Sequence, residues 1–106
     1  MKVAYIAMPY RADSTWEIRR NIQRAEHLAM KYWRLGYAVI CPHKNTAHFD
    51  GGADDSVWLD GDIEILKRCD VIVMGYNWVH SSGAKNELKE AEAAGLEVIY
   101  DDEHPF

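Results

Sequence analysis

Four short apolar runs recur along the chain, and each gives way to a polar segment. They lie at 2–8 (KVAYIAM), 37–41 (YAVIC), 70–76 (DVIVMGY) and 96–101 (LEVIYD). Runs of this length that contain many β-branched and aromatic residues are typical of buried strands. The pattern therefore predicts four strands that are separated by longer connections.

The connections between these runs repeat apolar residues at helical spacing. The first begins at Ser14, which can cap a helix with Glu17 three residues later, and it ends at Gly36. Further helices are predicted at 56–69 and 83–94. In the first helix the apolar side chains form one continuous stripe, which consists of Ile18, Ile22, Ala25, Ala29 and Tyr32.

Strands and helices alternate along the whole chain without a repeat or a linker. This alternation predicts a single α/β domain over 1–106, a three-layer sandwich whose parallel sheet of about four strands carries helices on both faces, as in flavodoxin-like and Rossmann-like folds. Ligands of such sheets bind beyond the carboxyl ends of the central strands. The loops at 8–14, 42–55 and 77–83 all follow strands, so we expect them to line one crevice.

Composition narrows the class of protein. The 106 residues are 48% hydrophobic, which suits one compact domain, and the formal net charge of −5 argues against a long nucleic acid as partner. No stretch approaches the roughly 18 apolar residues of a membrane span. The N-terminal segment reads as a strand and lacks a signal-peptide cleavage site, so a cytoplasmic protein is expected. Cys41 and Cys69 are then expected to be reduced and buried.

Two acidic residues lie on or beside the buried faces of their helices. Glu87 is three residues after Ala84 and four before Ala91, which should both face the sheet. Asp62 has the same relation to the stripe of the second helix, which consists of Leu59, Ile63 and Leu66. Such acids can also have no function of their own: they can interact favourably with the dipole at a helix N-terminus, or lie at the edge of the buried face and reach solvent. As a pair near one crevice they also suit glycosidic chemistry, in which one carboxylate attacks the sugar and the other handles the proton of the leaving group.

The crevice loops offer further candidate ligands. Ser81, Ser82 and Gly83 precede the third helix, where they can bind an anion or a sugar hydroxyl, or can merely cap the helix. His43 and Asn45 can bond a ligand or cap their own loop. We expect no metal, because His43, His48 and Asp50 lack a standard ligand spacing.

The tryptophans at 16, 33, 58 and 78 are expected to be core or interface anchors. Trp78 follows the third strand closely and is also a candidate for stacking on a base.

The runs YIAMPYR, PHKNTAHF, WLDGDIEILKRCDVIVMGYNW and SSGAKNELKEA occur here in an order and spacing that resemble the nucleoside 2-deoxyribosyltransferase-like superfamily. The resemblance spans nearly the whole chain and is greatest to small members catalogued as a domain of unknown function. It implies that Glu87 is the nucleophile, that Tyr5 orients it and that Asp62 handles the base or its proton. It also implies a phosphate-binding set of Pro9, Tyr10, Arg11, Ser82 and Gly83. Met8 stands where many relatives have glycine, which is expected to narrow or reshape the sugar pocket.

The function expected from these residues is N-glycosyl transfer or hydrolysis on a nucleoside, deoxynucleoside or nucleoside 5′-monophosphate, without a cofactor. The alternatives are a non-catalytic nucleotide-binding or sensing module with the same crevice, and an oligomerising protein that acts through an aromatic helix face. The expected partner is the small-molecule substrate, with no membrane or long nucleic acid. A homodimer or higher homo-oligomer is also expected, since four tryptophans are hard to bury in so small a domain.

Overall fold

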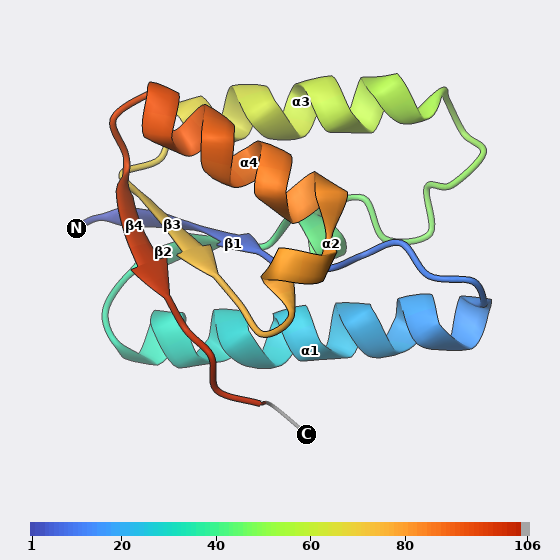
Figure 1. The fold of residues 1–106 in the computed structure, drawn as a ribbon, viewed down its shortest axis with the longest axis horizontal. Coiled ribbons are helices and arrows are strands. Elements are labelled where there is room, and N and C mark those ends of the chain that lie inside the picture. Colours follow the sequence, from blue (N-terminus) through green and yellow to red (C-terminus); the bar gives the residue numbers. More distant parts are fainter. Residues whose placement is uncertain (105–106) are drawn as a thin grey trace.

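Four parallel strands form the sheet in the computed structural model, which describes residues 1–104. They are β1 (Val3–Ala7), β2 (Ala38–Ile40), β3 (Val71–Met74) and β4 (Glu97–Tyr100). Their order is β2-β1-β3-β4, with β1 and β3 in the centre (Figure 1). The predicted α/β sandwich with a parallel sheet is confirmed, and the last two positions of the expected 1–106 domain lie outside the described residues.

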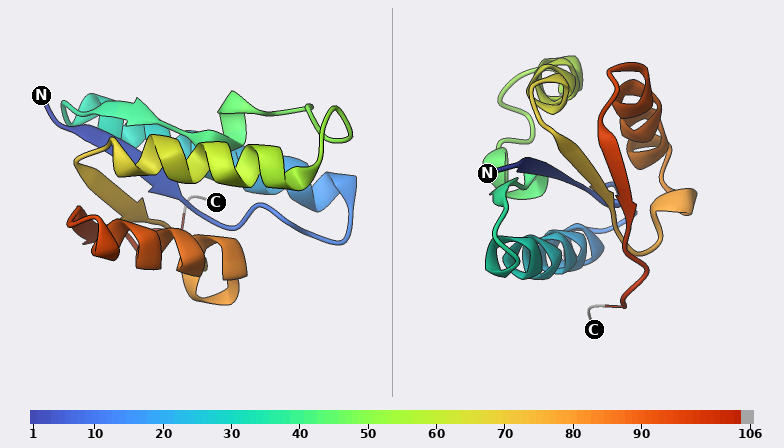
Figure 2. Two further views of the ribbon diagram at one scale, coloured as in Figure 1. Left: turned by 90° about the horizontal axis from the view of Figure 1, so that it is seen from above. Right: turned by 90° about the vertical axis from the view of Figure 1, so that its left-hand side faces the viewer.

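The three long helices cover both faces of this sheet. One face is covered by α1 (Thr15–Arg34), and the other by α3 (Asp55–Lys67) and α4 (Ser82–Ala93), as Figure 2 shows. The predicted cap of α1 forms, because the side chain of Ser14 accepts a hydrogen bond from the backbone N–H of Glu17 at 3.1 Å.

The alternation of side chains along β1 divides the core into two parts. Ala4, Ile6 and Met8 pack toward α1, while Tyr5 and Ala7 pack toward α3 and α4. The phenol of Tyr5 is therefore buried on the face where α4 begins.

The chain turns to opposite sides as it leaves the two central strands. From β1 it passes through α1 to β2, and from β3 through α4 to β4. The carboxyl ends of β1 and β3 consequently form a switch point, where the connecting loops diverge and leave a crevice.

Two connections that the sequence predicted as loops contain short helical turns. Pro42 opens a turn, α2 (Pro42–Asn45), because proline suits the first helical position, where its missing N–H costs nothing. A 3₁₀ turn (η1, Trp78–His80) precedes α4. Within the described part of the chain, no helix is long and apolar enough to cross a membrane.

Candidate active site

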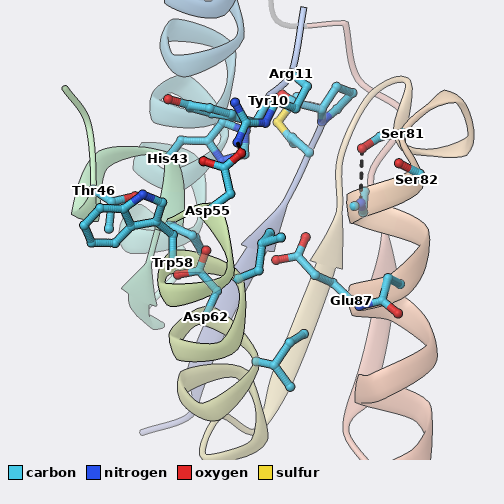
Figure 3. Close-up of a pocket in the computed structure, with 18 of the residues that line it drawn as sticks. Tyr10, Arg11, His43, Thr46, Asp55, Trp58, Asp62, Ser81, Ser82 and Glu87 are labelled. Atoms are coloured by element: carbon cyan, nitrogen blue, oxygen red, sulfur yellow. Dashed lines mark hydrogen bonds and ion pairs between the residues drawn. The ribbon is translucent and has the colours of Figure 1, made fainter. Parts of the chain in front are cut away.

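A cavity of about 430 Å³ opens at the carboxyl ends of the central strands, between the N-terminal parts of α3 and α4 (Figure 3). Residues from all three predicted crevice loops line it, and it is large enough for a small organic ligand. The predicted site residues that line it are Met8, Pro9, Tyr10, Arg11, His43, Asp62, Ser81, Ser82, Gly83 and Glu87.

Glu87 lies on α4 with its carboxyl group in the wall of the cavity, and it is largely buried. The hydroxyl of Tyr5 donates a hydrogen bond to Glu87 Oε2. Burial raises the pKa of Glu87 to about 7, the nearby charge of Asp62 adds to the rise, and the bond from Tyr5 opposes it. The pKa of Tyr5 is also raised, chiefly by burial and then by the charge of Glu87, so its proton stays on the phenol.

Asp62 projects from α3 on the opposite wall, as Figure 3 shows. Burial raises its pKa to about 6. The two carboxyl groups thus face one cavity in different surroundings, and each changes its protonation state near neutral pH. Such a pair can supply one carboxylate and one proton donor.

A second buried acid in the same fold shows the opposite shift. Burial alone would raise the pKa of Asp101, but hydrogen bonds from Lys31 and Tyr32, both at 2.8 Å, hold it below its usual value. Among the described residues, no such lysine or arginine bond is made to Glu87. The raised pKa of Glu87 therefore reflects the lack of a compensating cation, in addition to burial.

The loop after β1 is held at two consecutive carbonyl groups. His43 Nε2 lies 2.9 Å from the carbonyl oxygen of Pro9, and the side chain of Asn21 donates to the carbonyl of Tyr10 at 3.0 Å. Burial lowers the pKa of His43, so its ring is neutral, and an N–H at Nε2 serves this bond. His43 thus lines the cavity and fixes the loop that carries Tyr10 and Arg11.

The start of α4 forms another part of the wall. The Ser81 side chain accepts a hydrogen bond from the backbone N–H of Ala84 at 3.1 Å and caps the helix. Ser82 and Gly83 follow in the first turn and line the cavity. Backbone N–H groups in the first turn of an α-helix have no carbonyl partner within the helix, so those of Ser82 and Gly83 can bind an oxygen atom of a ligand.

Three residues differ from their sequence-based interpretation. Asn45 is exposed and does not line the cavity. Trp78 is partly buried, packs against the core on the α3 and α4 side, 5.7 Å from the ring of Tyr100, and does not line this cavity. Leu59 was predicted to lie on the buried stripe of its helix, but it is 57% exposed and lies at the cavity.

Met8 lines the cavity but is only 5% exposed, and its side chain packs across Gly75 next to Leu28. A Cβ atom at Gly75 would lie 2.4 Å from Met8 Cγ, so glycine is needed there to admit the methionine. Most of the Met8 side chain therefore lies in the core on the α1 side and not in the cavity.

Trp58, expected from the sequence to be only a core or interface anchor, is part of the cavity wall. Trp58 lines the cavity four residues before Asp62, on the same face of α3, and packs 5.7 Å from the ring of Phe49. Its buried indole nitrogen has no hydrogen-bond partner in the protein. The i, i+4 spacing from Asp62 was the signal that could have identified it. Trp16 and Trp33 are exposed and are not core anchors of this chain.

The described residues contain no group of three or more histidine, cysteine, aspartate or glutamate side chains that could hold a metal ion. Cys41 and Cys69 are free thiols.

A family model described as a domain of unknown function, DUF7768, matches residues 2–101. The chain belongs to this family. A comparison with the curated proteins gives no match to this DUF7768 domain. Among solved structures, one similar chain is a 2-desoxiribosyltransferase from Leishmania mexicana, with a TM-score of 0.65 and 18% sequence identity.

The match covers 97% of this chain and 66% of the Leishmania chain. At this identity the likeness shows a shared fold. The expected membership of a family catalogued as a domain of unknown function is confirmed.

Proposed function

We propose that this domain breaks the N-glycosidic bond of nucleosides or nucleoside 5′-monophosphates and passes the sugar to water or to a second base. The observation that carries the proposal is the placement of Glu87, a largely buried carboxyl group that faces the cavity and is held by the hydroxyl of Tyr5. Asp62 on the opposite wall supplies the second acid that this chemistry needs.

In the first step a carboxylate oxygen of Glu87 attacks C1′ of the sugar. A C1′–O bond forms as the C1′–N bond breaks, and the electron pair of that bond passes to the nitrogen of the base. Protonated Asp62 gives its proton to the departing base. The hydrogen bond from Tyr5 keeps the carboxylate in line with C1′.

In the second step water or another base attacks C1′ and releases Glu87 as a carboxylate. Asp62, now ionised, takes the proton that the attacking group loses, which restores the starting state of both acids. With a pKa of about 6 for Asp62 and about 7 for Glu87, the reactive form, in which Glu87 is ionised and Asp62 is protonated, is a minor form of the free site near neutral pH.

Trp58 is the side chain that can stack on the base. It offers an aromatic face at the cavity, directly above Asp62 on α3 (Figure 3). A base that stacks there would lie beside the proton donor, while the sugar would extend toward Glu87 on α4.

The test is to incubate the protein with a panel of deoxynucleosides and ribonucleosides and their 5′-monophosphates, with and without a second base. We expect base release or exchange that Glu87→Ala abolishes, and a sugar adduct on the Glu87 peptide by mass spectrometry. The exposed Glu92 on the same helix provides the control variant Glu92→Ala. Turnover that survives Glu87→Ala would remove Glu87 from the mechanism, and tight binding without turnover would favour the non-catalytic module.

A further inference from the structure

The charges around the cavity affect whether it accepts a nucleoside or its 5′-monophosphate. Among the described residues that line it, Arg11 is the only lysine or arginine, whereas four carboxyl groups face the same space. These are Asp50, Asp55, Asp62 and Glu87. The resemblance noted above implies that Arg11 binds a phosphate. Whether Arg11 is available for one depends on its partner in the fold.

Arg11 is already paired. Its Nη2 atom lies 2.6 Å from Asp55 Oδ2, so the ion pair joins the loop after β1 to the first turn of α3 (Figure 3). Next to it, the hydroxyl of Tyr10 donates to Asp50 Oδ1 at 3.2 Å. Two carboxylates thus accompany the one cation in this part of the wall.

The binding mode proposed above leaves this part of the wall for the 5′ end of the sugar. With C1′ at Glu87 and the base over Trp58 and Asp62, the far side of the sugar faces the loop after β1 and the start of α4. The amides of Ser82 and Gly83 there can bond a neutral hydroxyl as well as an anion. A phosphate, however, would meet Asp50 and Asp55 and would have to displace Asp55 from Arg11.

We infer that the site takes unphosphorylated nucleosides and discriminates against their 5′-monophosphates, because Asp55 neutralises Arg11 and Asp50 adds a negative charge beside it. The inference rests on the proposed function and names its substrate class. Both acidic residues are exposed, so the discrimination weakens as salt screens them.

The experiment compares kcat/KM for a deoxynucleoside and its 5′-monophosphate in the wild type, Asp55→Asn and Asp60→Asn. Asp60 is exposed on the same helix and does not line the cavity, so its variant removes the same charge without freeing Arg11. The wild type should prefer the nucleoside by about tenfold or more, equivalent to about 1.4 kcal/mol. Asp55→Asn should reduce that preference severalfold by raising kcat/KM for the monophosphate, and Asp60→Asn should leave it unchanged.

Binding supplies a readout that does not depend on turnover. Calorimetry with Glu87→Gln protein should give tighter binding of the nucleoside than of the monophosphate, with the difference largest at low salt. If the wild type binds the nucleoside more tightly than the monophosphate but shows no turnover, the proposed function is wrong and this inference is still supported. A wild type that prefers the monophosphate, equal effects of Asp55→Asn and Asp60→Asn, or no binding of either compound would overturn the inference.

Discussion

Replacing Glu87 with glutamine should stabilise the protein above neutral pH while it abolishes the proposed chemistry. Folding raises the pKa of Glu87 from 4.5 to about 7. An acid with a raised pKa favours the folded state fully below its unfolded pKa of 4.5, and this contribution is lost as the pH rises through about 7. Wild-type stability should therefore fall over this interval.

The size of the effect follows from the shift. Each pKa unit corresponds to about 1.4 kcal/mol, so ionising Glu87 in the folded state costs up to about 3 kcal/mol. Glutamine can accept the same hydrogen bond from Tyr5 and has no charge to desolvate. The difference in unfolding free energy between Glu87→Gln and the wild type should grow by up to about 3 kcal/mol between about pH 4 and about pH 8, which corresponds to roughly 10 °C or more in Tm.

Urea unfolding of both proteins across this pH range measures the difference directly. Glu92→Gln is the matched control, because Glu92 is exposed on the same helix, and its difference from the wild type should stay near zero. A Glu87→Gln difference that is the same at both ends of the pH range would refute the claim that Glu87 is held without a compensating cation.

Three further predictions concern Tyr5, Trp58 and Gly75. Tyr5→Phe should lower kcat for base release by about 10- to 100-fold with little change in KM, and it should move the acid limb of the pH profile upward, because the hydrogen bond that lowers the Glu87 pKa is lost. Trp58→Ala should raise KM about tenfold and Trp58→Phe should restore most of the affinity, if stacking is worth about 1–3 kcal/mol. Gly75→Ala should destabilise the fold by about 1–3 kcal/mol in urea unfolding, and adding Met8→Ala should relieve part of that loss, because the new Cβ would meet the methionine.

The fold could be predicted because its local signals agree with one another. The four apolar runs, the cap at Ser14 and the terminal glycines each depend on nearby residues, and together they specify alternating strands and helices. The acid pair could also be found, because Asp62 and Glu87 interrupt apolar stripes of known period. A charged residue on a buried face is visible without any tertiary information.

The remainder of the site depends on long-range contacts that have no period. The segment after β2 carries α2 and then a loop, so neither the pair between Arg11 and Asp55 nor the bond between Tyr10 and Asp50 could be derived from spacing. Trp58 was misjudged for the same reason. From the sequence alone, an aromatic residue on a helix is predicted to lie in the core, because the opposite wall of the cavity is not known.

The stability of the fold does not explain a carboxyl group at position 87. Asp101 shows how this domain accommodates a buried acid for structural purposes, with a lysine and a tyrosine that lower its pKa and anchor the end of β4 to α1. Glu87 has a tyrosine and a neighbouring acid instead, and both the burial and Asp62 penalise its charge. Glutamine would satisfy Tyr5 at lower cost. The property that glutamine lacks is an ionisable oxygen that faces the cavity, which is the property a glycosyl acceptor requires.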